Sequence, residues 1–420
     1  MEGQNIRQYH NAVRWIQSFV RPSVQFTLDR RNPQRYLDRM RVLCAHLGNP
    51  QDAFRIIHIA GTAGKGTVAT LVAGMLAAAG HRTGLYTSPY CITPIENIAV
   101  NGQYISPKEF QGITLQLKET IVRLRKSSLG SPSTFELMTA MAFLYFKQRQ
   151  CAWAVIEAGL GGRYDATNIV EHPSICAITA IGLDHTNVLG KTVQAIARDK
   201  AQIIKFQADV FTNVSQEGVV GILRQQSQRV GARFHPPQRP LTNVYLSERI
   251  GTVLRLPDHA IQQVIEQTHL PCRREWVESH IVLDGAHSPV KMRYFCQSLP
   301  RRKHGASRIA VVGITSDKNK EGILRTLIPH IDTLIVTPFP MNGWGRRRSA
   351  TAGELAATAR RIRPSIDVRI VSAPLAALKK ARALARADDL IIITGSFYLA
   401  GFLRRQWYSE QWTLRHRRSF

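Results

Sequence analysis

Residues 55–73 of this 420-residue chain read R-I-I-H-I-A-G-T-A-G-K-G-T-V-A-T-L-V-A. The β-branched run that ends at Ile59 predicts a buried strand, and the apolar stretch after Thr67 predicts a helix. Three glycines lie between them, and their missing side chains would let backbone N–H groups approach a ligand closely: Gly61, Gly64 and Gly66. The stretch therefore predicts a strand, a phosphate-binding loop and a helix in succession.

The loop departs from the strict P-loop spacing, because position 59 is Ile and Gly66 separates Lys65 from the following hydroxyl. Its mechanics do not depend on that spacing. Free amides at a helix N-terminus attract anions. Lys65 can then reach the β- and γ-phosphates, and Thr67 can hold a magnesium ion. A plain strand-to-helix turn is the alternative, but it does not require the sequence Gly-Lys-Gly-Thr after an apolar strand.

Length and composition favour a globular protein of two domains. A chain of 420 residues is two to three times the length of a typical domain. Hydrophobic residues make up 44% of it, with no apolar run long enough to cross a membrane. The first ten residues, M-E-G-Q-N-I-R-Q-Y-H, lack the apolar core of a secretory signal. These features predict a cytoplasmic protein.

The six cysteines lie far apart and form no C-x-x-C pair: Cys44, Cys91, Cys151, Cys176, Cys272 and Cys296. Several have apolar neighbours. They are expected to be reduced, mostly buried thiols, neither a disulfide framework nor a zinc site.

The net charge is strongly positive, at +27, because 56 Lys and Arg residues face 29 Asp and Glu residues. Such a field attracts polyanions. The basic residues cluster at three places: Arg301 to Lys303, Arg346 to Arg348, and a tail with Arg404, Arg405, Arg415, Arg417 and Arg418. Because the clusters are scattered and lack interleaved aromatic residues, a basic solvated surface is favoured over a nucleic-acid site.

Strand and helix patterns alternate along the chain, which is typical of α/β proteins with parallel sheets. In the first part, strands are expected at 154–156, 175–181 and 210–212. The proline-rich segment F-H-P-P-Q-R-P at 234–240 interrupts the alternation. In the second part, the expected strands are 281–283, 309–312, 333–336, 368–371 and 390–394, with helices from Val290 and over 374–385. The predicted fold is a P-loop-type parallel-sheet ATPase domain over 1–273, followed by a smaller Rossmann-like α/β domain over 274–420.

Three more polar clusters follow predicted strands. Glu157 begins a glycine-rich loop that runs to Asn168, and a carboxylate there can bind Mg²⁺ opposite the P-loop hydroxyl. His185 lies in G-L-D-H-T, where a hydrogen-bonded loop histidine is an equally good interpretation. Asp284 and His287 follow the first strand of the second domain. The carboxyl ends of strands are the usual ligand side of an open α/β sheet.

These motifs, in this order, resemble the folylpolyglutamate synthase and dihydrofolate synthase branch of the Mur ligase family. The resemblance covers nearly the whole chain. It includes the motifs L-G-N-P, G-T-A-G-K-G-T, Y-T-S-P, V-N-G-Q-Y-I-S, T-F-E-L-M-T-A, E-A-G-L-G-G-R-Y-D-A-T-N, I-G-L-D-H-T-N-V-L-G, D-K-A-Q-I-I-K, L-D-G-A-H-S-P, D-K-N-K and T-G-S-F-Y-L.

The resemblance implies a ligase that uses ATP to phosphorylate a carboxylate and then lets an amino acid's amine displace the phosphate. It implies L-glutamate as the amine and a folate or dihydropteroate as the acid. It also implies two Mg²⁺ sites, one at Thr67 and Glu157 and one at His185 and Lys200, with Lys200 carbamylated. The implied catalytic residues are Lys65, His185 and Lys200. The implied ATP contacts are Gly61, Thr62, Gly64, Lys65, Gly66, Thr67, Asn243, Arg273, Asp284 and His287.

Ser88, Tyr90, Phe135 and Asp165 fall on the family's substrate-binding segments. Several positions depart from the family pattern: Ala63, Gln202 and Ser288, together with Tyr90 for His, Asn97 for Arg and Cys272 for Gly. The Gly-x-His-Gln stretch that normally precedes Asn243 is replaced by Arg239-Pro240. Because Tyr90 and Asn97 lie in the expected loop over 87–100, the departures bear most on the acceptor substrate.

Two other functions remain open at this stage. One is a divergent Mur-type ligase with another carboxylate acceptor, and the other is a non-catalytic paralogue that binds ATP or a polyanion. Retention of Lys65, Thr67, Glu157, His185 and Lys200 favours an enzyme. The expected partners are small molecules, with neither nucleic acid nor a membrane, and the expected state is a monomer.

Overall fold

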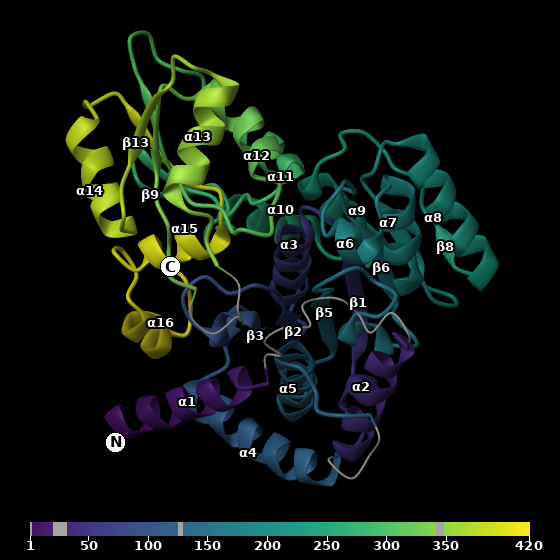
Figure 1. Cartoon of the computed structure of the whole chain (residues 1–420). Helices are drawn as coiled ribbons and strands as arrows, with labels where there is room; N and C mark the ends of the chain where they lie inside the picture. The colour runs from purple at the N-terminus through teal and green to yellow at the C-terminus, as the bar shows by residue number, and fades with distance from the viewer. Residues whose placement is uncertain (1, 20–31, 125–128, 342–347) are drawn as a thin grey trace. The chain divides into compact units, whose positions relative to one another are not determined.

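The computed structural model describes residues 2–19, 32–124, 129–341 and 348–420. The chain divides into two compact units, Met1–Pro89 with Pro94–Thr268 and Tyr90–Thr93 with His269–Phe420 (Figure 1). The predicted domain boundary after residue 273 lies close to the boundary between Thr268 and His269. The short segment Tyr90–Thr93 joins the second unit, and no sequence pattern indicated this.

The first unit is built on an eight-stranded sheet in the order β4-β3-β2-β5-β1-β6-β7-β8. Its strands are β1 (Arg55–Ala60), β2 (Thr83–Tyr86), β3 (Ile98–Val100), β4 (Gln103–Tyr104), β5 (Trp153–Glu157), β6 (Ile175–Ile178), β7 (Asp209–Thr212) and β8 (Arg233–Phe234). All neighbours are parallel except β3 and β4, which form an antiparallel edge. The expected parallel sheet is thus confirmed, with an edge that alternation did not indicate.

Strand β1 lies between β5 and β6, and its residues from Ile56 to Ala60 are buried, as is typical of a strand inside a parallel sheet. Ile57 and Ile59 join a core cluster with the helix that follows the glycine loop, whereas Ala60 belongs to the cluster on the opposite face. The expected strand over 175–181 is too long, since β6 ends at Ile178. Two residues further on, the carbonyl of Ala180 accepts from the N–H groups of Thr62 and Ala63 in the glycine loop instead of from a neighbouring strand.

The helices and 3-10 turns of this unit are α1 (Glu2–Gln17), α2 (Gln34–His46), η1 (Pro50–Ala53), α3 (Lys65–Ala78), η2 (Pro94–Asn97), α4 (Pro107–Leu124), α5 (Thr134–Gln148), η3 (Ala166–Ile169), α6 (Thr186–Leu189), α7 (Val193–Lys200), η4 (Ala201–Ile203), α8 (Glu217–Val230), α9 (Asn243–Val253) and α10 (Asp258–Gln267). The expected loop over 87–100 is wrong in its second half, which forms η2 and β3. Asn97, at the end of η2, is only 3% exposed, so it does not line an open surface.

The second unit carries a six-stranded sheet in the order β13-β12-β11-β14-β10-β9. Its strands are β9 (Glu275–Glu278), β10 (Ile281–Leu283), β11 (Arg308–Val312), β12 (Thr333–Val336), β13 (Asp367–Ile370) and β14 (Leu390–Thr394), and its helices and 3-10 turn are α11 (Pro289–Gln297), α12 (Lys320–Leu327), η5 (Ile328–His330), α13 (Ala352–Ile362), α14 (Pro374–Leu384), α15 (Phe397–Arg404) and α16 (Glu410–His416). Only β9 is antiparallel to its neighbour. The expected Rossmann-like alternation is confirmed.

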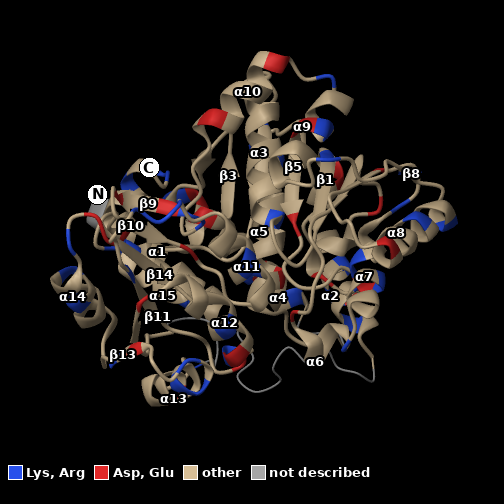
Figure 2. Cartoon of the chain, turned by 90° about the horizontal axis from the view of Figure 1, so that it is seen from above, with Lys and Arg blue, Asp and Glu red and all other residues tan. Residues whose placement is uncertain are grey.

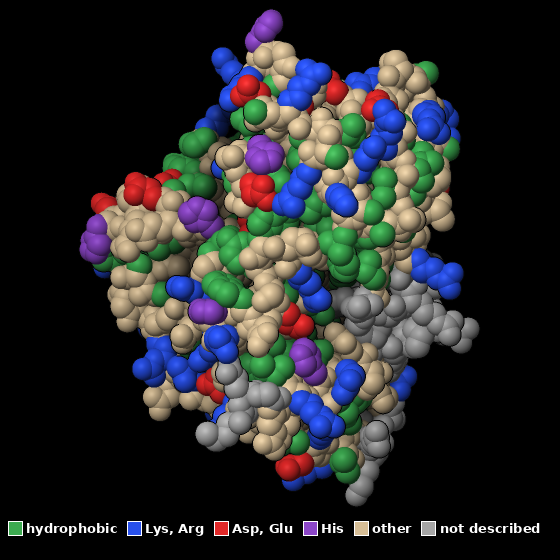
Figure 3. Space-filling view, turned by 90° about the vertical axis from the view of Figure 1, so that its left-hand side faces the viewer, with side chains coloured by type: hydrophobic (Ala, Val, Ile, Leu, Met, Phe, Trp, Pro, Cys, Tyr) green, Lys and Arg blue, Asp and Glu red, His purple; other side chains and the backbone are tan. Residues whose placement is uncertain are grey.

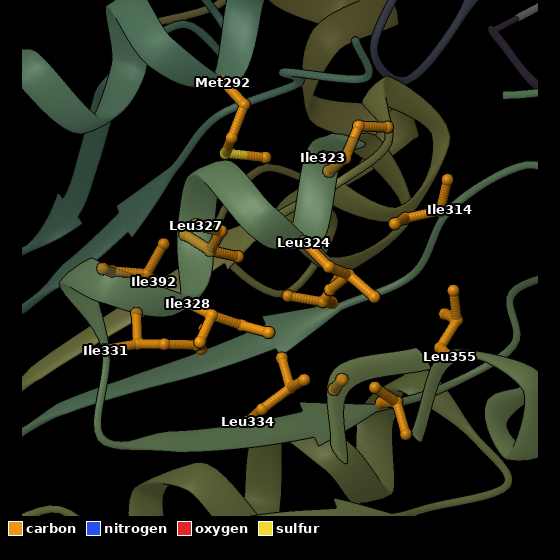
Figure 4. Packing of buried hydrophobic residues seen from close by; sticks show 14 of the residues in the cluster. Met292, Ile314, Ile323, Leu324, Leu327, Ile328, Ile331, Leu334, Leu355 and Ile392 are labelled. Atoms are coloured by element: carbon orange, nitrogen blue, oxygen red, sulfur yellow. The ribbon is translucent and has the colours of Figure 1, made fainter. Parts of the chain in front are cut away.

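The core of this second unit shows why the strands were predictable. Leu324 and Leu327 of α12 pack with Leu334 of β12 and Met292 of α11 in one buried cluster (Figure 4). Each such side chain contributes about 1.5–3 kcal/mol on burial. Short apolar runs between polar turns therefore mark the elements that build the core.

The surface carries its positive charge in a dispersed form. Helix α8 carries Glu217 in its first turn and Arg224 and Arg229 further along (Figure 2), and basic side chains are interspersed with other types on the face in Figure 3. Arg302 and Lys303 pair with Asp332 and Asp388. Arg346 and Arg347 lie outside the described residues. The dispersion agrees with the expected basic solvated surface.

One member of the expected basic tail is not on the surface. Arg404 is fully buried, and its Nε donates to both carboxylate oxygens of Glu275 at 2.8 and 2.9 Å. It also donates to the carbonyl of Ser419 and lies over the ring of Tyr408. The expectation that Arg404 belongs to a solvated cluster was wrong, because tail packing gives its guanidinium a partner.

No disulfide joins any of the six cysteines, all of which lie in the described ranges, and five of them are buried. This agrees with the expected thiols. None of the described helices has the length and apolarity needed to cross a bilayer.

Candidate active site

The glycine loop lies at the carboxyl end of β1, and α3 starts directly after it at Lys65. Gly64 has φ +89°, and a Cβ there would lie 2.5 Å from both polar atoms of the Asn243 side chain. Glycine is therefore required at this position for two reasons, its left-handed backbone and the close approach of an amide group. The fold thus brings Asn243, the first residue of α9, against the loop.

Thr62 ties the loop to the chain beyond β6. Its N–H donates to the carbonyl of Ala180 at 2.8 Å, and its hydroxyl lies 3.1 Å from the carbonyl oxygen of Gly182 and 3.2 Å from the Gly182 nitrogen. Thr62 is accordingly buried, and its polar groups already have partners in the chain. Gly66 and Thr67 lie in the first turn of α3, where Thr67 is half-buried.

Lys65 faces a carboxylate across the end of the sheet. Its Nζ lies 3.7 Å from Oε1 of Glu157, the last residue of β5. The other oxygen of Glu157 accepts from the N–H of Ser88 at 3.1 Å. An ion pair of 3.7 Å is looser than a direct hydrogen bond. Both side chains are therefore mostly buried, but their charges are only loosely paired with each other.

Asp165 has a different environment from Glu157, although both lie on the same strand–loop segment. Its carboxylate accepts from the N–H of Leu160 at 2.8 Å and from the N–H and hydroxyl of Thr167 at 3.0 and 2.6 Å. Burial raises the pKa of Asp165, and these hydrogen bonds oppose the rise. Asp165 therefore stabilises its own loop by accepting hydrogen bonds from two of its residues.

His58 of β1 extends this network beneath the loop. Its Nε2 lies 2.7 Å from the hydroxyl of Thr167. Because that hydroxyl donates its hydrogen to Asp165, the Thr167 oxygen accepts from Nε2–H of His58. Complete burial, together with the positive charge of Lys205, lowers the pKa of His58 to about 3. The imidazole is therefore neutral at ordinary pH.

The loop after Glu157 also packs against the end of α7. A Cβ on Gly162 would lie 2.8 Å from the backbone of Lys200, and the N–H of Gly162 donates to Asp199 at 2.8 Å. Lys200 is 4% exposed. His185, at the start of α6, has a left-handed backbone and an Nε2 that lies 3.8 Å from Asp184. Sequence reasoning missed Asp199, because its role depends on a contact between two loops.

The predicted substrate residues fall into both units. Ser88 meets Glu157 through its backbone, and the ring of Phe135 in α5 lies 6.0 Å from that of Tyr86, both in the first unit. Tyr90 belongs to the segment Tyr90–Thr93 of the second unit. The neighbouring Cys91 packs against Cys272, Phe397 and Ala400 there.

In the second unit, Asp284 follows β10 and accepts hydrogen bonds from the N–H groups of Arg274 and Ala286, both at 2.8 Å. Burial raises the pKa of Asp284 to about 6, while the two backbone donors act in the opposite direction. The guanidinium of Arg273 lies over the ring of Phe397 at 5.5 Å. The carboxylate of Asp284, at the end of β10, is thus already bound by backbone N–H groups of the same unit.

His287 is fixed on both sides of its ring. Nδ1 lies 2.8 Å from the carbonyl of Gly285, and Nε2 lies 2.8 Å from Nζ of Lys291 in α11. A carbonyl only accepts, so Nδ1 carries the hydrogen and Nε2 accepts from the ammonium. Lys291 was missed in the sequence, where its only signal is its position four residues after His287.

The donor set near Glu157 suits Mg²⁺. Within the described part of the chain, no three His, Cys, Asp or Glu side chains are grouped so that they could hold a metal ion. Mg²⁺ does not need such a cage, because it commonly binds one or two carboxylates, retained waters and substrate phosphates. A hydroxyl at Thr67 and the loosely paired carboxylate of Glu157 fit that requirement.

Comparison with known proteins agrees with this geometry. The family model of the Mur ligase middle domain matches residues 59–232, which include the glycine loop, Glu157, His185 and Lys200. The model of the Mur ligase glutamate ligase domain matches residues 272–397, which include Asp284 and His287. Both matches are to Mur ligases, the class of protein that the sequence motifs indicated.

Individual relatives narrow the class. The dihydrofolate synthase/folylpolyglutamate synthase of Bacillus subtilis (strain 168) is 30% identical over 418 residues, which cover 88% of this chain and 94% of the relative. Folylpolyglutamate synthase of Mycobacterium tuberculosis, solved with ADP, matches with a TM-score of 0.84 at 26% identity and covers 96% of this chain and 99% of its own. A bifunctional folylpolyglutamate synthase/dihydrofolate synthase, solved with Mn, AMPPNP and L-glutamate, matches with a TM-score of 0.78 at 29% identity. The match covers 88% of this chain and 93% of the solved one. The chain belongs to the folylpolyglutamate synthase/dihydrofolate synthase branch of the Mur ligase family.

Proposed function

We propose that this protein joins L-glutamate to the carboxylate of a folate or dihydropteroate in a reaction driven by ATP. The observation that carries the proposal is the loose Lys65–Glu157 pair beside a glycine loop at the end of a parallel sheet. Relatives of the same family are named for this ligation, and their solved structures contain ADP, or Mn with AMPPNP and L-glutamate.

The chemistry proceeds in two balanced steps. An oxygen of the substrate carboxylate attacks the γ-phosphorus of ATP, the bond to the bridging oxygen breaks, and ADP leaves. The amine of glutamate then attacks the acyl phosphate, forms the amide, releases inorganic phosphate and loses a proton. Lys65 and the amides of the glycine loop oppose the negative charge on the transferring phosphoryl group.

Mg²⁺ supplies charge neutralisation to the phosphates when it is bound. The side chains proposed to hold one ion are Thr67 and Glu157. His185 and a carbamylated Lys200 are proposed for a second ion. Burial of Lys200 beside the Gly162 backbone supports its modification, because a carbamate converts a buried ammonium into oxygen ligands.

The nucleotide contacts proposed beyond the glycine loop are Asn243 in the first unit and Arg273, Asp284 and His287 in the second. The contact of Asn243 with Gly64 supports its part. Both ring nitrogens of His287 already meet Gly285 and Lys291, so His287 is proposed to act on the nucleotide indirectly, by holding the Lys291 ammonium in place.

The acceptor is the part of the proposal that the departures from the family affect most. Tyr90 replaces a histidine, and loss of a charge-assisted hydrogen bond of about 1.5–3 kcal/mol weakens binding of an anionic substrate. Asn97, which replaces an arginine, is buried and is not expected to contact the substrate directly. Folate-type ligation with a high KM is therefore expected. A ligase for another carboxylic acid is the second candidate, favoured by the change at Tyr90.

The test is ATP turnover with glutamate and dihydropteroate, folate or a panel of other carboxylic acids. The proposal predicts ADP release that depends on both glutamate and a pteroate-type acid, with the amide product seen by mass spectrometry. Turnover with another acid alone would establish the second candidate. Absence of any acid-dependent turnover would rule out both ligase functions.

A further inference from the structure

The segment Tyr90–Thr93, which we call the acceptor segment, belongs to the second unit although the chain on either side of it belongs to the first. It lies outside every helix and strand, and its first residue is the half-buried Tyr90, which is proposed to bind the acid. A stretch without helix or sheet hydrogen bonds takes its conformation from the elements that it packs against. The position of Tyr90 therefore depends on contacts that the acceptor segment makes within the second unit.

Helix α15 holds the acceptor segment at two successive residues. A Cβ on Gly401 would overlap the carbonyl oxygen of Cys91. Because that obstacle is backbone and not a flexible side chain, only glycine lets the segment lie so close to the helix. Directly after α15, Nη2 of Arg405 donates to the carbonyl oxygen of Ile92 at 2.9 Å. The segment is thus fixed to α15 by close packing at one peptide and by a hydrogen bond from a cation at the next.

The start of α15 is itself held in place. The ring of Phe397 packs so tightly on Gly285 that a Cβ there would overlap it, and the guanidinium of Arg273 lies 5.5 Å from the centre of the same ring. Phe397, Gly401 and Arg405 are four residues apart, so they follow one face of the helix. One face of α15 therefore supports both the acceptor segment and residues that are proposed to lie near the nucleotide.

We propose that Gly401 and Arg405 are positioning residues for the acceptor substrate, which act by holding the acceptor segment so that Tyr90 binds the acid. The inference rests on the proposed function and deepens it, since it names what sets the place of Tyr90. Gly401 acts by leaving room for the Cys91 carbonyl, and Arg405 acts by fixing the Ile92 carbonyl. Small displacements of a group that orients a substrate cost much of the rate. The effect is specific to the acid, because the proposed ATP contacts do not include the acceptor segment.

The experiment measures steady-state kinetics of the whole protein with ATP, L-glutamate and dihydropteroate. Gly401→Ala is expected to lower kcat/KM for dihydropteroate by at least about tenfold. Arg405→Ala is expected to lower it by about three- to tenfold, through KM. The KM for ATP should stay within about twofold of the wild-type value, whereas a general structural defect would raise it as well. Arg405→Lys keeps a cationic donor and should recover most of the loss.

Two variants serve as matched controls. Gly353→Ala adds a Cβ to another helix of the second unit, α13, where it would meet no atom within 4 Å. Arg418→Ala removes an exposed arginine from the same tail. Both should leave kcat/KM for dihydropteroate unchanged.

If Gly401→Ala does not fold, Arg405→Ala still decides the question, because the Arg405 side chain is exposed at the end of its helix. An unchanged kcat/KM for dihydropteroate in folded Arg405→Ala overturns the inference while the proposed function stands. A KM for ATP that rises as much as the KM for dihydropteroate, or a lysine variant as poor as the alanine variant, also overturns it. If the wild-type protein does not turn over dihydropteroate, the proposed function fails and this inference fails with it.

Discussion

The ends of the two sheets hold their charged groups in different ways. In the first unit, Lys65 and Glu157 lie 3.7 Å apart, and one oxygen of Glu157 meets a single backbone N–H at 3.1 Å. In the second unit, Asp284 and His287 each meet two partners from their own chain at 2.8 Å. The first arrangement leaves charge available to a ligand, whereas the second fixes side chains in place. Polar side chains at the end of a strand can therefore bind a ligand or stabilise the local structure, and their hydrogen-bond partners distinguish the two roles.

The largest effect is expected at Lys65. Lys65→Ala removes the positive charge that opposes the phosphoryl group, so kcat should fall by about three orders of magnitude or more. Unfolding temperature should change little, because Lys65 makes only a loose ion pair. Steady-state kinetics and thermal unfolding check this, with the exposed Lys191→Ala as the control. Retained turnover would contradict the assignment of the glycine loop.

Glu157→Gln should lower kcat/KM by about two orders of magnitude and raise the magnesium concentration needed for half-maximal rate. The free energy of unfolding should change little beside this kinetic effect, since the ion pair with Lys65 that the variant loses is loose, at 3.7 Å. A magnesium titration of activity measures this, alongside the exposed Glu171→Gln. An unchanged magnesium requirement would show that Glu157 binds no metal.

Asp165→Asn should act mainly on stability. The carboxylate accepts three hydrogen bonds, and an amide would place N–H groups against some of those donors. The free energy of unfolding should fall by about 1–3 kcal/mol, measured by chemical denaturation. A variant of full stability with a raised KM would instead make Asp165 a substrate contact, as the family resemblance implied.

The most gradual expected effect is a pH dependence of stability from His58. In the unfolded chain its imidazole takes up a proton below about pH 6.5, but the folded protein resists this until about pH 3. The unfolded state thus binds more protons in this window, so stability falls as pH falls, by up to about 1.4 kcal/mol per unit. Denaturation curves between pH 4 and 7 should show a shallower slope for His58→Gln. An equal slope would place a titrating group elsewhere.

Much of the fold was predictable because it depends on local patterns. The buried run that ends at Ile59, the glycine loop and Glu157 at the end of β5 all follow from short stretches of sequence. The strands of the second unit were equally clear, since polar turns bound each apolar run. Asn243 and Lys200, for which the resemblance implied nucleotide and metal binding, lie against Gly64 and Gly162.

What could not be predicted depends on contacts between distant segments. Asp199 gains its role only when two loops meet, and Arg405 only when α15 meets the acceptor segment. Arg404 was assigned to the surface because its tail is basic, but Glu275, more than a hundred residues earlier, gives it a buried partner. Past the end of β6, the carbonyl of Ala180 likewise accepts from the distant glycine loop instead of from a neighbouring strand.

The most direct test of ligation through an acyl phosphate uses a pteroate-type substrate whose reacting carboxylate carries ¹⁸O. If an oxygen of that carboxylate attacks ATP, glutamate later displaces it together with the phosphoryl group. The account predicts one ¹⁸O atom in the inorganic phosphate for each amide formed, measured by mass spectrometry. Amide formation with unlabelled phosphate would contradict it.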